Sequence, residues 1–76
     1  MLDPAEIQER IAAALPGAVV EVRDTTGGGD HFEARVVCAA FAGKTRVQQH
    51  QMVYAPLRDL LATGELHALA LTTGVP

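Results

Sequence analysis

The sequence is poor in the residues that build several common kinds of protein site. It contains a single cysteine, Cys38, so an internal disulfide is excluded and a thiolate metal site would need ligands from another chain. No apolar run approaches the roughly 20 residues of a membrane span. Asp3 and Glu6 stand where a secretory signal would be basic. These absences predict a cytoplasmic protein that does not enter a membrane.

Recognisable catalytic motifs are also absent. No Ser or Cys triad and no close carboxylate pair stands out in the 76 residues, so we do not expect an enzyme. The Gly27–Gly29 run is followed by no Walker lysine and leads into a predicted strand, which favours a turn over a phosphate cradle. Cys38 is predicted to face the core as an inert thiol. A thiol enzyme acting through Cys38 remains a less favoured alternative.

Positive charge is scarce overall but unevenly placed. Six Lys and Arg against nine Asp and Glu give a net charge of −3, so the overall field does not attract a polyphosphate. No acidic residue occurs between Glu33 and Asp59, a stretch that contains four basic residues: Arg35, Lys44, Arg46 and Arg58. This basic segment is either a solvated surface or a set of phosphate contacts.

The first half of the chain predicts one helix and a hairpin. Asp3 and Pro4 are typical of a helix start, and Ile7, Ile11 and Leu15 form an apolar stripe, which together predict a helix over residues 4–15. Residues 18–24 and 31–38 alternate between apolar and polar side chains, as strands with one buried face do. The glycine-rich turn between them predicts an antiparallel hairpin.

The second half predicts a helix and a third strand. The stripe Val47, His50, Tyr54, Leu57 and Leu61 has helical spacing and ends near Thr63. Pro56 removes a backbone donor, so we expect a kink, or a short first segment and a restart near Pro56. Residues 66–72 predict a strand that a helical crossover places parallel to the second strand.

Together the elements predict a single α+β domain over residues 1–76. It is a small two-layer sandwich in the order helix, strand, strand, helix, strand, with a three-stranded mixed sheet and both helices on one face.

The three histidines are the main candidates for chemistry. His67 opens the last predicted strand, where a neutral imidazole could bind a metal that a partner also holds, or could simply satisfy a strand-end hydrogen bond. His31 follows the glycine loop and is either a second ligand or a surface residue. His50 lies on the predicted apolar stripe and is expected to be a core or cap histidine.

These features resemble the BolA family. The resemblance runs from about Val19 to Thr73 and rests on five segments: Val22-Arg23-Asp24, the glycine-rich turn into His31-Phe32, Phe41-Ala42-Gly43-Lys44, the run from Arg46 to Tyr54, and His67-Ala68-Leu69. It implies a sandwich similar to a class II KH domain. Pro56 departs from the pattern, because many relatives carry alanine there.

The resemblance also implies a function. BolA-like proteins pair with monothiol glutaredoxins and share a 2Fe–2S cluster, for which glutaredoxin and glutathione supply thiolates and the BolA-like partner supplies histidine. His67 matches the carboxyl-terminal ligand of that motif. Gly29 stands about where one subtype has a cysteine ligand, so this chain resembles the histidine subtype, with His31 as the second ligand.

The expected role is that of a non-enzymatic partner in iron–sulfur cluster assembly, trafficking or iron sensing, with no cluster bound when the protein is isolated. The alternative is a nucleic-acid-binding regulator whose Lys44, Arg46 and Arg58 contact phosphates. Against this alternative, the sequence has no Gly-x-x-Gly clamp of the KH type.

Overall fold

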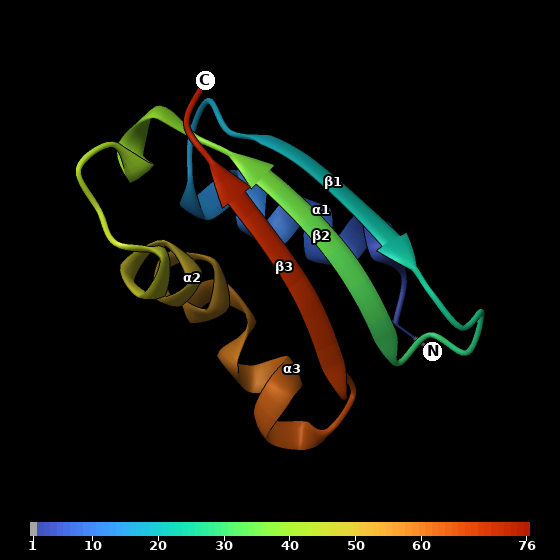
Figure 1. Ribbon diagram of the computed structural model, residues 1–76. Coiled ribbons are helices and arrows are strands. Elements are labelled where there is room, and N and C mark those ends of the chain that lie inside the picture. Colours follow the sequence, from blue (N-terminus) through green and yellow to red (C-terminus); the bar gives the residue numbers. More distant parts are fainter. Residues whose placement is uncertain (1) are drawn as a thin grey trace.

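Three strands form one mixed sheet in the order β1-β2-β3, and all the helices cover one of its faces (Figure 1). The computed structural model describes residues 2–76. Its elements are α1 (Pro4–Ala14), β1 (Val19–Asp24), β2 (His31–Val37), the 3-10 turn η1 (Ala39–Phe41), α2 (Arg46–Tyr54), the 3-10 turn η2 (Ala55–Leu57), α3 (Arg58–Thr63) and β3 (Ala68–Gly74). The two-layer α+β fold predicted from the sequence is confirmed.

The start of α1 follows from its cap. The Asp3 carboxylate accepts a hydrogen bond from the Ala5 N–H at 2.9 Å, and Pro4 occupies a first-turn position where its missing N–H costs nothing. Ile7, Ile11 and Leu15 face the sheet and are buried, as the stripe predicted. Helix α1 therefore forms one half of the helical layer.

The sheet is buried on one face and open on the other. β1 and β2 pair antiparallel and β2 and β3 pair parallel, as the sequence predicted. Along β2, Phe32, Ala34 and Val36 are buried, while His31 and its alternate neighbours are exposed. Cys38 is also buried, at 3% exposure, which agrees with its predicted place in the core. The third strand begins two residues later than predicted, so His67 precedes β3 and does not lie within it.

The segment after residue 45 forms two helices, α2 and α3. A capping box starts α2: the Gln48 N–H donates to the Thr45 hydroxyl, and the Gln48 side chain accepts from the Thr45 N–H. The helix ends at Tyr54, just before Pro56, and α3 begins at Arg58. Of the two alternatives predicted for Pro56, the restart is the one observed.

The predicted apolar stripe of this segment was wrong at its two ends, although its member Leu57 is fully buried. Val47 is 66% exposed and Leu61 is 37% exposed, whereas Val53 and Leu60 are buried. His50 is half-buried and lies edge-on to Tyr54, so it is neither a core nor a cap histidine. The 3-10 turn between the helices breaks the helical periodicity, so the stripe could not be extrapolated across it to Leu61.

Further contacts tie the two halves of the helical layer together. Phe41, predicted to lie in a connection, is fully buried in η1, and Leu57 of η2 is fully buried with it in the common core. The Arg10 guanidinium of α1 donates hydrogen bonds of 2.7 and 2.9 Å to the two carboxylate oxygens of Asp59 in α3. Within residues 2–76, no helix is long and apolar enough to cross a membrane.

Candidate metal-binding site

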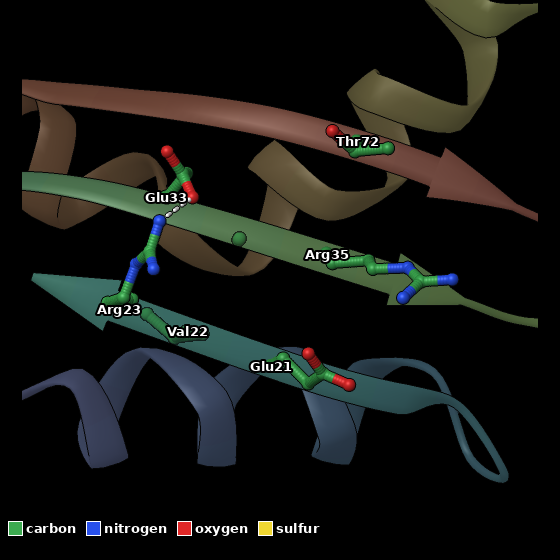
Figure 2. Close-up of a pocket in the computed structure, with 7 residues that line it drawn as sticks. Glu21, Val22, Arg23, Glu33, Arg35 and Thr72 are labelled. Atoms are coloured by element: carbon green, nitrogen blue, oxygen red, sulfur yellow. Dashed lines mark hydrogen bonds and ion pairs between the residues drawn. The ribbon is translucent and has the colours of Figure 1, made fainter. Parts of the chain in front are cut away.

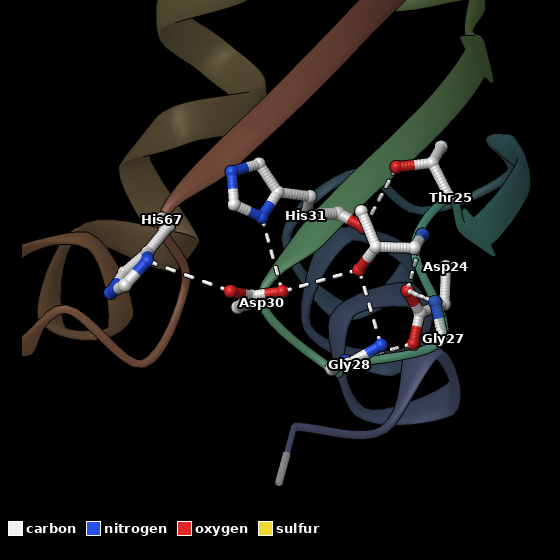
Figure 3. Close-up of polar contacts among 9 residues, drawn as sticks. Asp24, Thr25, Gly27, Gly28, Asp30, His31 and His67 are labelled. Atoms are coloured by element: carbon white, nitrogen blue, oxygen red, sulfur yellow. Dashed lines mark hydrogen bonds and ion pairs between the residues drawn. The ribbon is translucent and has the colours of Figure 1, made fainter.

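The parallel pairing of β2 with β3 brings His31 and His67 together. His31 is paired with Ala68, so His67 lies one position before the start of the pairing, at the same edge of the sheet. Their ring centroids are 5.9 Å apart and the ring planes are nearly perpendicular, at 86°. The side chains are 46% and 58% exposed respectively. The two histidines predicted as metal ligands thus lie side by side and are open to solvent (Figure 3).

The loop between β1 and β2 is held in shape by Asp24. Its carboxylate accepts hydrogen bonds from the N–H groups of Thr26, Gly27 and Gly29, at 2.9 to 3.1 Å. Gly27 and Gly29 have φ values of +78° and +74°, a backbone region that L-residues with a side chain rarely adopt. The loop is therefore an ordered turn that fixes where β2 and His31 begin.

A third residue, Asp30, lies between the two histidine rings. One carboxylate oxygen is 3.1 Å from Nδ1 of His31, and the other is 3.7 Å from Nδ1 of His67. Its backbone carbonyl accepts a 2.9 Å hydrogen bond from the His67 N–H. The hydrogen bond from His31 is the main reason that the pKa of Asp30 lies below its ordinary value. An anionic side chain thus faces both rings.

Sequence reasoning did not find Asp30. Its position directly before His31 was visible, but acidic residues are common in turns and carry no signal of their own. What gives Asp30 its place is the register of β2 against β3, which brings His67 opposite it. That register is a long-range property of the sheet.

His67 is positioned by its neighbours on the amino-terminal side. Leu66 is buried at 1% exposure, and its N–H donates to the carbonyl of Leu60 in α3. Gly64 ends α3 with a φ of +81°, and a Cβ added there would lie 3.8 Å from Nε2 of His67. Glycine therefore closes the helix, and a Cβ at this position would be in ordinary van der Waals contact with Nε2 of His67.

The arrangement fits part of a metal site. On each ring, Nδ1 is the nitrogen nearer Asp30, which leaves Nε2 free to bind a metal. On one tetrahedral metal, metal–imidazole bonds of about 2.1 Å put two ring centroids about 5.3 Å apart. The observed 5.9 Å is wider, so the two rings would have to move closer together to bind the same metal. Among residues 2–76, no group of three or more His, Cys, Asp and Glu side chains is placed to hold a metal ion.

The residues predicted for phosphate contact are not gathered in one place. Lys44 precedes α2, Arg46 is its first residue, and Arg58 begins α3 beyond the other end of α2. All three are exposed. The structure therefore spreads these cations along the two helices.

A shallow hollow lies on the open face of the sheet. It has a volume of about 500 Å³ and is lined mainly by charged side chains: Glu21, Arg23, Glu33 and Arg35, with Thr72 of β3 beside them (Figure 2). Arg23 and Glu33 form a 2.6 Å ion pair across β1 and β2. Neither histidine lines this hollow.

Comparison with known proteins places this chain in a family. Residues 11–76 match the model of the family described as BolA-like protein. The chain is 36% identical, over 99% of its length, to SufE-like protein 1, chloroplastic/mitochondrial, of Arabidopsis thaliana, and it covers 20% of that protein. It is 35% identical, over 93% of its length, to the acid stress protein IbaG of Escherichia coli K12, of which it covers 81%.

A solved structure agrees with this match. The BolA domain of SufE1 from Arabidopsis thaliana superimposes with a TM-score of 0.85 at 34% identity, covering 96% of this chain and 91% of that one. The chain belongs to the BolA-like protein family. It spans only about a fifth of the full SufE-like protein 1, so it is similar to one domain of that protein.

Proposed function

We propose that this protein is a non-enzymatic partner of a monothiol glutaredoxin and that the two proteins hold a 2Fe–2S cluster between them. In this proposal, the imidazoles of His31 and His67 are the ligands from this chain. The observation that carries it is the placement of two exposed histidines with centroids 5.9 Å apart at one edge of the sheet. The proposed role is cluster assembly, transfer or iron sensing.

The donor set supports a shared site. A 2Fe–2S cluster takes four protein ligands, and histidine can replace cysteine at two of them. His31 and His67 would supply two ligands, and the thiolates of glutaredoxin and glutathione would supply the others. The occurrence of a similar BolA domain in a plant protein named SufE-like protein 1 further supports a role in iron–sulfur biology.

Each residue at the site would have a distinct task. His31 and His67 would present their Nε2 atoms at the exposed edge, where a partner can approach. Gly64 would end α3 three residues before His67. A cluster bound through imidazole carries less negative charge than one bound only through thiolates, and it has a higher reduction potential.

The test is reconstitution of the complex. The protein would be mixed anaerobically with a monothiol glutaredoxin, glutathione, iron and sulfide, and visible absorption and circular dichroism would be recorded. We expect a spectrum that differs from that of the glutaredoxin alone, and loss of this difference in His67→Ala. His50→Ala is the matched control, because His50 lies in α2 and does not contact the site. An unchanged spectrum in His67→Ala would refute the proposal.

Nucleic-acid binding is the second candidate function. It is favoured only by the exposure of Lys44, Arg46 and Arg58, and the spread of these residues over two helices gives it less support. A gel shift at low salt tests it, with binding expected to weaken in Arg46→Ala and as salt rises. Failure to bind at low salt would eliminate this alternative.

A further inference from the structure

We infer that Asp30 is a positioning residue that orients both histidines and fixes the proton of His31 on Nδ1, leaving its Nε2 free for metal. This inference rests on the proposed function for its purpose, but its physical content concerns the free protein. It depends on the contacts that Asp30 makes with each of the two histidines.

The contact with His31 determines which nitrogen carries the proton. Nδ1 of His31 lies 3.1 Å from a carboxylate oxygen of Asp30, and because an ionised carboxylate only accepts hydrogen bonds, it favours the tautomer with the proton on Nδ1. A neutral imidazole has one N–H, and placing it on Nδ1 leaves the lone pair on Nε2. Carboxylates bound to the far nitrogen of a metal-binding histidine act in this way in many metalloproteins.

The contact with His67 acts mainly through the backbone. The Asp30 carbonyl accepts hydrogen bonds from the N–H groups of His67 and Ala68, at 2.9 and 3.3 Å, and so sets where β3 begins to pair. The 3.7 Å separation between the Asp30 carboxylate and Nδ1 of His67 is too long for a hydrogen bond. The negative charge of the Asp30 carboxylate at this distance still favours a proton on Nδ1 of His67. One residue thus contacts both histidines, through its side chain at His31 and mainly through its backbone at His67.

The Asp30 carboxylate is itself held by the loop. Its Oδ1 atom accepts a 3.3 Å hydrogen bond from the Thr26 hydroxyl, and that hydroxyl accepts one from the Gly28 N–H at 3.1 Å. Asp24 fixes the same turn through three backbone N–H groups. The chain of contacts from loop to carboxylate to imidazole therefore orients His31 before any metal arrives (Figure 3).

The first test reads the histidine tautomers in the free protein by ¹⁵N NMR at a pH where the rings are neutral. In the wild type, Nδ1 of His31 should have the shift of a protonated nitrogen and Nε2 that of an unprotonated one. Asp30→Ala should change the tautomer ratio by about tenfold, the low end for losing a hydrogen bond to a charged group. Asp30→Asn, which keeps the side-chain size, should give a smaller change in the same direction.

Glu33→Gln is the matched control. It removes a negative charge from the same strand, but Glu33 pairs with Arg23 and contacts neither ring. The tautomer ratio of His31 in Glu33→Gln should equal that in the wild type. Equal ratios in wild type, Asp30→Ala and Asp30→Asn would overturn the inference, as would a change in Glu33→Gln as large as that in Asp30→Ala. Backbone amide shifts of β2 and β3 verify that each variant is folded.

The second test measures the affinity of the shared cluster in the glutaredoxin complex. We expect Asp30→Ala to weaken it by about 10- to 100-fold, as loss of an orienting partner typically does. If His67→Ala changes the cluster spectrum while Asp30→Ala changes neither tautomer nor affinity, the inference about Asp30 fails and the proposed function stands. If His67→Ala has no effect but the tautomer shifts in Asp30→Ala, the proposed function fails and the orienting contact stands.

Discussion

Replacing Val53 and Val47 by alanine, one at a time, tests how α2 packs. The two valines lie in the same helix, but Val53 is fully buried and Val47 is 66% exposed. Removing two buried methyl groups costs about 1.6 kcal/mol of transfer free energy. The cavity left behind raises the expected loss for Val53→Ala to about 2–3 kcal/mol. Val47→Ala loses little burial and gains helix propensity, so its change should stay within about 0.5 kcal/mol.

Urea unfolding followed by circular dichroism is the assay. A domain of 76 residues has a total stability of about 4–11 kcal/mol. With a slope of about 1 kcal/mol per molar urea, Val53→Ala should lower the midpoint by about 2 M or more, and Val47→Ala should hardly move it. Equal losses of stability in the two variants, or a larger loss in Val47→Ala, would contradict the burial of Val53 and the exposure of Val47 described above.

Three further predictions concern local features. Thr45→Ala should lower the free energy of unfolding by about 1 kcal/mol, because Thr45 caps α2; Thr45→Ser should recover most of that loss in the same urea titration. Asp59→Asn removes the negative charge and one of the two oxygens that accept hydrogen bonds from Arg10, whose contacts lower the pKa of Asp59. A carboxyl group with a lowered pKa stabilises the fold fully above its ordinary pKa of about 4, and this stabilisation is lost as the pH falls through the lowered pKa. The urea midpoints of wild type and Asp59→Asn should therefore differ at pH 7 and converge only below the lowered pKa. A difference that persists in acid would contradict this ion pair. Gly64→Ala should cost about 1–2 kcal/mol in thermal unfolding because of its positive φ, and Gly64→Asn less; equal costs would count against a conformational origin.

The sequence predicted most of the fold because its strongest signals are local. The cap at Asp3, the alternation of β2 and the glycine-rich turn each depend on neighbouring residues, and each was confirmed. In the stripe from Val47 to Leu61, Leu61 was misassigned because the turn at Pro56 shifts the helical phase, whereas Val47 was misassigned within α2 itself.

The candidate site was only partly accessible to the same reasoning. His31 and His67 could be chosen from their types and places, and the parallel pairing predicted for their strands puts both at one edge. The contacts of Asp30 could not be chosen in that way. Its contact with His31 is between neighbours in sequence, but its contact with His67 depends on the register between segments more than 30 residues apart, which no local pattern encodes. Whether the two histidines bind iron stays a prediction.

The most direct test of the proposed function is pulsed electron paramagnetic resonance of the reduced cluster in the glutaredoxin complex. The spectrum would be recorded with this protein either unlabelled or ¹⁵N-labelled at histidine. We predict nitrogen hyperfine couplings that change with the label, with separate losses in His67→Ala and in His31→Ala. A reduced cluster that shows no histidine nitrogen coupling would contradict the claim that this chain holds iron through its two histidines.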